Sequence, residues 1–135
     1  MEEWRQRAVD TFPELRRELT EPDEWEMLEI DSVYDLWGTL SDLVRKAHRA
    51  QDDDMLARIY GYASWSTRHP SKDIWNAAGV AFYEHIFDEV WMRWLVIPWL
   101  DQYVVDACWG LWAQFSDLVA IRWMLKESGF AIPGE

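Results

Sequence analysis

Apolar residues recur at helical spacing along most of the chain, and the pattern is most regular between Ser71 and Trp99. Ser71 can cap a helix there, and Asp73 suits the first turn of that helix. One face of the stretch then collects Ile74, Trp75, Ala78, Phe82, His85, Ile86 and Glu89. Because residues three and four apart share one side of an α-helix, this spacing predicts a central helix over about residues 72–95.

Residues 32–69 carry two shorter patterns with the same period. The first places its apolar positions at Val33, Leu36, Trp37, Leu40, Leu43, Val44 and Ala47. The second opens with Asp52, Asp53 and Asp54, whose negative charge suits a helix N-terminus, and it ends before Pro70. His48 and His69 lie where these helices end, a position that favours cations. A tight turn between the two patterns predicts an antiparallel helical hairpin.

The two ends of the chain predict shorter or less regular helices. One short helix starts at Thr11, and a second starts at Thr20 and continues through Trp25 and Leu28. The last helix covers about residues 98–128 and ends before Gly129. No alternation typical of a β-strand is sustained. The sequence therefore predicts an all-α fold, a single-domain bundle of five to six helices spanning residues 1–135.

The composition of the chain indicates one hydrophobic core and a strongly negative net charge. Half of the 135 residues are hydrophobic, eleven of them tryptophan, which is enough to bury one core. Thirteen Lys and Arg oppose 25 Asp and Glu, so the formal net charge is −12. That charge repels nucleic-acid phosphates and anionic lipid surfaces. We therefore expect neither nucleic acid nor a membrane to be a direct partner.

The single cysteine, Cys108, excludes an internal disulfide and cannot by itself form a thiolate metal site. It falls on an apolar helix face without a neighbouring base, which indicates a core residue rather than a nucleophile. No apolar run reaches roughly 18 residues, the length needed to cross a membrane, and the N-terminal segment lacks a signal-peptide pattern. We predict a cytoplasmic protein without a cofactor.

One cluster of side chains has catalytic or metal-binding potential. In a helix, His85 faces Asp88 and Glu89 one turn away, and Glu84 faces Asp88. An imidazole beside carboxylates can transfer protons or bind a metal. A pocket built around it would be lined by Trp75, Asn76, Tyr83, His85, Asp88 and Glu89. Metal sites on helices need ligands from other helices, and His48 and His69 already suit helix ends. We therefore favour a structural role for His85, hydrogen-bonded inside the core or at its edge.

Acidic residues are concentrated near the N-terminus, where residues 1–31 hold eleven Asp and Glu against four Lys and Arg. The densest part consists of Glu21, Asp23, Glu24, Glu26, Glu29 and Asp31, with Trp25 among them. Such a run is often only a solvated helix face, but its density here favours a surface for a basic partner. Trp25 would be an aromatic anchor in that surface, because tryptophan is enriched at the centres of protein interfaces.

Several segments of the chain resemble a family of small, uncharacterised bacterial proteins that are all-helical. The resemblance lies in LARIYGYASWSTRHP and KDIWNAAGVAFYEHIFD and in the later PW and CWGLW, about half of the chain. It implies an all-helical fold and brings no activity or site residues with it. In composition, the chain is also similar to immunity proteins and antitoxins, which neutralise basic or nucleic-acid-binding partners.

The leading hypothesis is a protein-binding module, immunity- or antitoxin-like, that presents its acidic surface to a basic partner protein. The alternative is a small-molecule or metal-binding protein, or an enzyme, that uses the cluster around His85. A homo-oligomer that buries its surplus tryptophans in its own interface is a third interpretation. The lack of a catalytic motif favours a role without catalysis.

Overall fold

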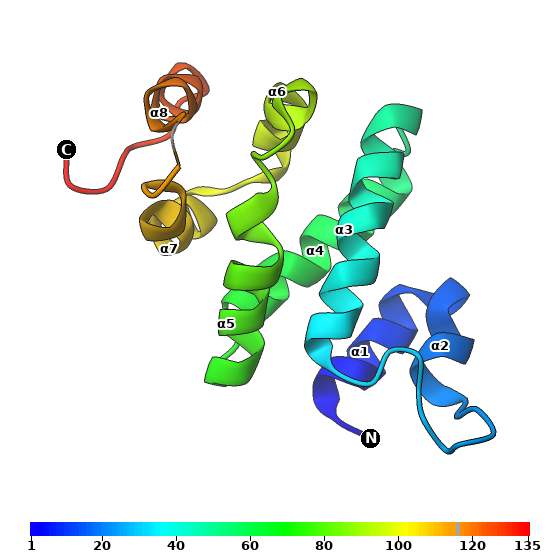
Figure 1. The fold of residues 1–135 in the computed structure, drawn as a ribbon. Helices are drawn as coiled ribbons and strands as arrows, with labels where there is room; N and C mark the ends of the chain where they lie inside the picture. The colour runs from blue at the N-terminus through cyan, green and yellow to red at the C-terminus, as the bar shows by residue number, and fades with distance from the viewer. Residues whose placement is uncertain (116) are drawn as a thin grey trace.

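All regular secondary structure in the described chain is helical (Figure 1). The computed structural model of the protein describes residues 1–115 and 117–135. Within them, the α-helices are α1 (Glu3–Thr11), α2 (Arg16–Thr20), α3 (Val33–Ala50), α4 (Asp53–Thr67), α5 (Lys72–Ala81), α6 (Arg93–Val96), α7 (Gln102–Trp112) and α8 (Leu118–Glu127). Short 3-10 turns are η1 (Pro13–Leu15), η2 (Tyr83–His85), η3 (Val90–Met92) and η4 (Ile97–Trp99). The predicted all-α, single-domain fold is confirmed, with more helices than the expected five to six.

The hairpin of α3 and α4 lies at the centre of the molecule, with α1 and α2 on one side and α5 on the other (Figure 1). Ser32 caps α3 through a reciprocal pair of hydrogen bonds with Asp35, each 3.1 Å long. Gln51 then adopts a left-handed conformation (φ 53°), which reverses the chain within two residues. Asp52 caps α4 by accepting a hydrogen bond from the Met55 amide at 3.1 Å. The predicted hairpin is confirmed.

The predicted central helix over residues 72–95 is wrong in its extent, because α5 ends at Ala81. Phe82 leaves helical geometry (φ −127°, ψ −69°), and the chain continues through η2, η3 and α6. The interruption frees backbone carbonyls that a continuous helix would use internally. The Trp112 indole donates to the carbonyl of Tyr83 at 2.7 Å, and the Arg93 guanidinium donates to that of Phe87 at 2.7 Å. Side chains from α6 and α7 therefore stabilise the break.

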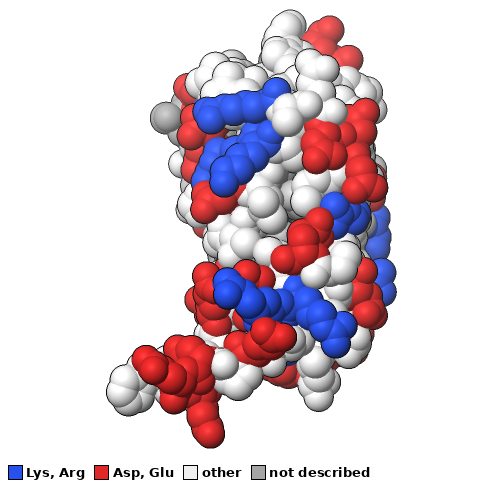
Figure 2. All heavy atoms as spheres, turned by 90° about the vertical axis from the view of Figure 1, so that its right-hand side faces the viewer, with Lys and Arg blue, Asp and Glu red and all other residues white. Residues whose placement is uncertain are grey.

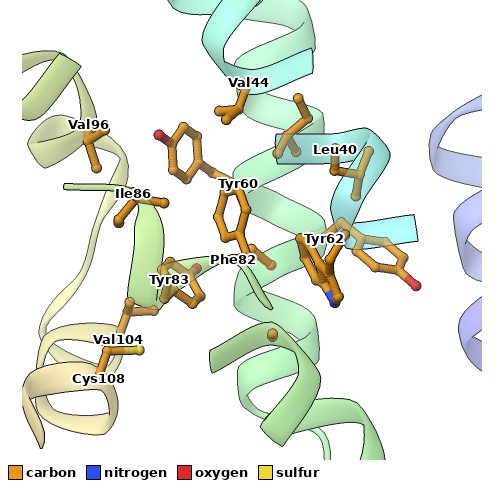
Figure 3. Close-up of a cluster of buried hydrophobic side chains, with 14 of the residues drawn as sticks. Leu40, Val44, Tyr60, Tyr62, Phe82, Tyr83, Ile86, Val96, Val104 and Cys108 are labelled. Atoms are coloured by element: carbon orange, nitrogen blue, oxygen red, sulfur yellow. The ribbon is translucent and has the colours of Figure 1, made fainter. Parts of the chain in front are cut away.

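Aromatic rings form a continuous core between the hairpin and α7. Trp37, Tyr62, Phe82, Tyr83 and Trp112 are almost fully buried. Ring centroids are 5.6 Å apart for Trp37 and Tyr62, 5.0 Å for Trp37 and Phe82, and 5.1 Å for Phe82 and Tyr83. Figure 3 shows how Tyr60, Tyr62, Phe82 and Tyr83 fill the space between these helices. The packing of large rings explains why a chain this short has a well-filled interior.

Three other features near the ends of the chain differ from the predictions. Helix α1 is not among the predicted elements, and the expected helix from Thr20 through Leu28 is instead a loop that follows α2. The expected helix over residues 98–128 is divided into α7 and α8. Asp117, just before α8, pairs with Arg93 at 3.0 Å, so the division turns α8 toward the segment of α6. On α8, Val119 and Trp123 are exposed.

Candidate functional site

The run of acidic residues predicted to bind a partner forms a loop with a defined shape, residues 21–31, here called the acidic loop. The Asp23 carboxylate accepts hydrogen bonds from the amides of Trp25 (2.8 Å) and Met27 (2.9 Å). The Asp23 amide donates to the Met27 carbonyl at 2.9 Å, and the Glu26 amide donates to the Asp23 carbonyl at 3.0 Å. Glu26 itself is left-handed (φ 58°). These bonds replace those of the predicted helix, since an Asp side chain competes well for nearby amides.

Arg5 of α1 fastens both ends of the acidic loop. Its guanidinium donates to the carbonyl of Leu19 (2.8 Å), just before the loop, and to those of Ile30 (2.7 Å) and Asp31 (2.7 Å), the last two residues of the loop. Arg5 is only 5% exposed, and the Ile30 amide adds a hydrogen bond to the Glu18 carbonyl at 3.0 Å. A compact loop whose ends are tied together in this way is an Ω-loop. Arg5 is not among the residues predicted for the site, although it lies on the same helical face as Ala8 and Phe12.

The tip of the acidic loop exposes two large apolar side chains between carboxylates. Trp25 is 76% exposed and Met27 is 62% exposed. The six acidic residues predicted for this site are all exposed: Glu21, Asp23, Glu24, Glu26, Glu29 and Asp31. Within the described chain none of the six forms an ion pair, whereas Glu14, Asp101 and Glu135 are paired with arginines. Figure 2 views the side of the molecule that carries this loop and shows a projection with acidic and uncharged side chains.

A hollow of about 560 Å³ lies between α2 and the acidic loop. Glu18, Glu21, Asp23 and Glu29 contribute carboxylates to its wall, Met27 contributes an apolar side chain, and Arg17, paired with Glu18 at 3.5 Å, contributes one positive charge. Among the described residues, one oxygen of Glu18 (Oε2) is buried without a hydrogen-bond partner. A negative concave wall beside an exposed aromatic side chain can accept a cationic group from a partner, because opposite charge strengthens contact in a partly desolvated hollow.

The structure does not bring the residues of the alternative site into one pocket. Trp75 and Asn76 lie on α5 beside α7, whereas Tyr83 is buried in the core. His85, Asp88 and Glu89 are exposed elsewhere, after α5 has ended. The His85 side chain is 56% exposed, with Nδ1 3.1 Å from Asp88 and Nε2 3.6 Å from Glu84. His85 is hydrogen-bonded as expected, but it lies at the surface beside buried Phe82 and Ile86 rather than inside the core, and its carboxylate neighbours come from its own segment.

His48 and Cys108 are two buried groups whose acid–base behaviour is set by burial. His48 was expected to be a cation at a helix end, but it is buried and its Nε2 lies 2.8 Å from the Tyr60 hydroxyl. Burial lowers the pKa of His48, because the charged imidazolium would lose its hydration. Burial likewise raises the pKa of the Cys108 thiol to about 12. Both groups are therefore held in their neutral forms at neutral pH.

Metal clusters and membrane-spanning helices are both absent from the described residues. No three His, Cys, Asp or Glu side chains come together there as they would around a metal ion. None of the described helices combines the length and the apolar character needed to span a membrane.

Comparison with known proteins gives a family without an assigned role. A family model described as a domain of unknown function, DUF7674, matches residues 5–96. No curated protein and no solved structure matches the chain. The matched residues extend from α1 to the end of α6, so they include Arg5 and the whole acidic loop.

Proposed function

The chain belongs to the DUF7674 family, whose function is unknown, and we propose that it binds a basic protein through the acidic loop. The single observation that carries this proposal is the exposed Trp25 held among six unpaired carboxylates on a loop of fixed shape. The proposal extends to an immunity- or antitoxin-like role, in which occupying a basic surface neutralises the partner.

The shape of the acidic loop supports binding because a fixed loop loses little conformational freedom when a partner docks. Three hydrogen bonds from Arg5 hold the base, and the Asp23 carboxylate holds the tip. The exposed rings and thioether at the tip give a partner apolar surface to cover. Tryptophan contributes disproportionately to affinity when it fills a pocket in the partner.

The charge of the acidic loop supports a basic partner. Six acidic side chains within residues 21–31 carry no neutralising Lys or Arg in the described structure, so their field extends into solvent. Complementary charge accelerates association and excludes acidic competitors. The field is screened within about 10 Å at 0.1 M salt. Binding should therefore weaken markedly as salt rises, mainly through slower association.

The alternative function at His85 has weaker support. The imidazole has carboxylate neighbours, Glu84 and Asp88, but the groups expected to complete a pocket lie on other parts of the surface or in the core. General acid–base catalysis needs a substrate held within hydrogen-bond distance of the acting group. An open surface around His85 gives a substrate few contacts.

The test is affinity capture from the organism that encodes the chain, followed by quantitative mass spectrometry. Wild-type protein is compared with Trp25→Ser and with a triple variant, Glu21→Gln, Glu24→Gln and Glu26→Gln, which removes charge and keeps side-chain size. We expect one or a few basic proteins to be captured by the wild type and lost with either variant. The affinity of a purified partner should fall roughly tenfold or more between low and high salt.

The matched control is Trp123→Ser on α8, because Trp123 is also highly exposed (57%) but lies outside the acidic loop. Partners retained by the control and lost with Trp25→Ser identify the loop as the interface. Capture that is equal for all variants, or a complex indifferent to salt, would refute the proposed function.

A further inference from the structure

A cavity of about 200 Å³ lies between α5 and α7, away from the acidic loop. Its lining includes Trp75, Asn76 and Gly79 of α5, Cys108 and Leu111 of α7, and Thr67 at the end of α4. Exposed Trp75 and Ala107 lie at its opening to solvent, and buried Cys108 lies at its inner end, so a small molecule can enter from solvent. We propose that the cavity binds an uncharged, mainly apolar small molecule with one aromatic ring and one hydrogen-bonding group.

Small residues create the cavity. Gly79 has no side chain, and a Cβ added there would lie 3.4 Å from the Leu111 Cδ1 atom, an ordinary contact. Cys108, only 1% exposed, lies against the cavity from α7. Figure 3 shows its sulfur directed away from the axis of α7 and toward the centre of the buried cluster. A larger residue at Gly79 would therefore project into the space beside Leu111, which lines the cavity.

The lining selects an uncharged ligand. None of the described residues that line the cavity carries a formal charge, and burying an ion without a counter-charge is costly. The Cys108 thiol stays protonated, since its burial opposes formation of the thiolate. An anion or a cation would therefore find no partner in this cavity. This chemistry separates the cavity from the acidic loop, which favours cations.

The volume of the cavity and its polar groups restrict the class of ligand further. An apolar cavity of roughly 150 Å³ can hold benzene, so about 200 Å³ suits one ring with a small substituent. Asn76 has one long contact, 3.5 Å from its Nδ2 to the Tyr34 hydroxyl, so its carboxamide oxygen can accept a bond from a ligand. Trp75 is partly exposed and can stack against the ring. Few, directed polar groups in an apolar hollow are the usual composition of a small-molecule site.

The test uses phenol, toluene and benzoate as probes in ¹H–¹⁵N NMR titrations of the full chain. Phenol offers a ring and a hydroxyl donor, toluene lacks the donor, and benzoate adds a charge. We expect saturable shifts with phenol at the amides of Thr67, Asn76, Cys108 and Leu111, and weaker binding of toluene. Benzoate should bind at least about tenfold more weakly than phenol because its charge would be buried without a partner.

The decisive variant is Gly79→Leu, which fills the cavity, and the matched control is Gly61→Leu on α4. A Cβ at Gly61 meets nothing within 4 Å, so both variants replace a helical glycine with leucine but only one occupies the cavity. Phenol binding should weaken at least about tenfold in Gly79→Leu and persist in Gly61→Leu. If Gly79→Leu does not fold, Asn76→Leu decides, because it should abolish the preference for phenol over toluene.

Several results would overturn the proposal. The first two are a wild type without saturable shifts and shifts that Gly79→Leu does not reduce. The other two are benzoate binding as tightly as phenol and an Asn76→Leu variant that still prefers phenol over toluene. Each result leaves the proposed function of the acidic loop untouched, because none of these residues belongs to that loop.

Discussion

Replacement of Arg5 by methionine removes the guanidinium that ties α1 to both ends of the acidic loop. Methionine keeps a flexible apolar side chain in the space of the arginine stem, so the change mainly deletes hydrogen bonds. The carbonyls of Leu19 and Ile30 then lose buried bonds of 2.8 Å and 2.7 Å. The carbonyl of Asp31 loses a bond of 2.7 Å that is only partly buried, so water can replace it.

The magnitude follows from the number of buried bonds. A hydrogen bond to a charged group contributes roughly 1.5–3 kcal/mol to stability, and two such bonds of Arg5 are fully buried. Because contributions in one network are not additive, we expect Arg5→Met to lower the free energy of unfolding by about 3–5 kcal/mol. That is a large part of the roughly 5–15 kcal/mol that stabilises a typical domain.

Urea unfolding followed by circular dichroism measures this loss, with Arg7→Met as the matched control. Arg7 lies on the same helix but is exposed, and its guanidinium lies 4.7 Å from the centre of the Trp65 ring. The control should therefore lose no more than about 1 kcal/mol. Hydrogen exchange of the Ile30 amide, which is bonded to the Glu18 carbonyl, should accelerate in Arg5→Met only. Equal losses in the two variants would refute the role assigned to Arg5.

Three further predictions concern buried and exposed side chains. Burial lowers the pKa of His48, so the unfolded chain binds that proton more readily, and stability should fall as the pH drops below the ordinary value of 6.5 and level off below the folded pKa. In urea unfolding at about pH 7.5 and about pH 5.5, His48→Gln should remove this part of the pH dependence, and an unchanged slope would contradict the assignment. Burial raises the pKa of Cys108 from 9.0 to about 12, which lowers the thiolate fraction at pH 8 by roughly a thousandfold. Iodoacetamide should therefore modify native protein far more slowly than urea-unfolded protein, and equal rates would show an accessible thiol. Because Trp25 is so exposed, Trp25→Ser should change the unfolding free energy by no more than about 0.5 kcal/mol, and a larger loss in the same urea assay would show that the ring packs.

The hairpin was predictable because its signals are local. Ser32 and Asp35 stand at capping spacing, Asp52 opens the second helix, and the apolar positions repeat on one face of α3. Each signal depends on residues within one or two turns. The fold class needed only such signals, so the sequence was sufficient for it.

The end of α5 at Ala81 was not predictable in the same way. Residues 82–87 keep an apolar spacing compatible with a helix, and Phe82, Tyr83, Ile86 and Phe87 are all buried. Outside an α-helix, the carbonyl of Tyr83 accepts from Trp112, 29 residues later, and that of Phe87 accepts from Arg93, six residues later. Tertiary contacts of this kind override local helix preference. The contacts of His85 with Glu84 and Asp88 are present, but the pocket predicted around them depended on a continuous helix and does not form.

The candidate site was predictable in its residues but not in its shape. The density of charge and the presence of Trp25 identified residues 21–31 as a candidate site. The helix predicted there does not form, because the Asp23 carboxylate binds the nearby backbone amides instead. Arg5 was overlooked because its partners are backbone carbonyls. Every residue has a backbone carbonyl, so the amino-acid sequence does not indicate which ones an arginine binds. A charged residue on an otherwise apolar helix face is the signal that could have identified it.

Substitution of Arg5 also distinguishes what the shape of the acidic loop contributes to binding from what its direct contacts contribute. Because Arg5 is buried, a partner can contact little of it, and any loss of binding in Arg5→Met must act through the loop that it fastens. Trp25→Ser instead removes contact surface and leaves the fastening intact. If the fixed shape of the loop contributes to affinity, Arg5→Met should bind the partner more weakly than the wild type does. The measurement is made without urea, where the domain remains folded. Binding that survives loss of Arg5 but not loss of Trp25 would mean that the loop reaches its bound shape only on the partner.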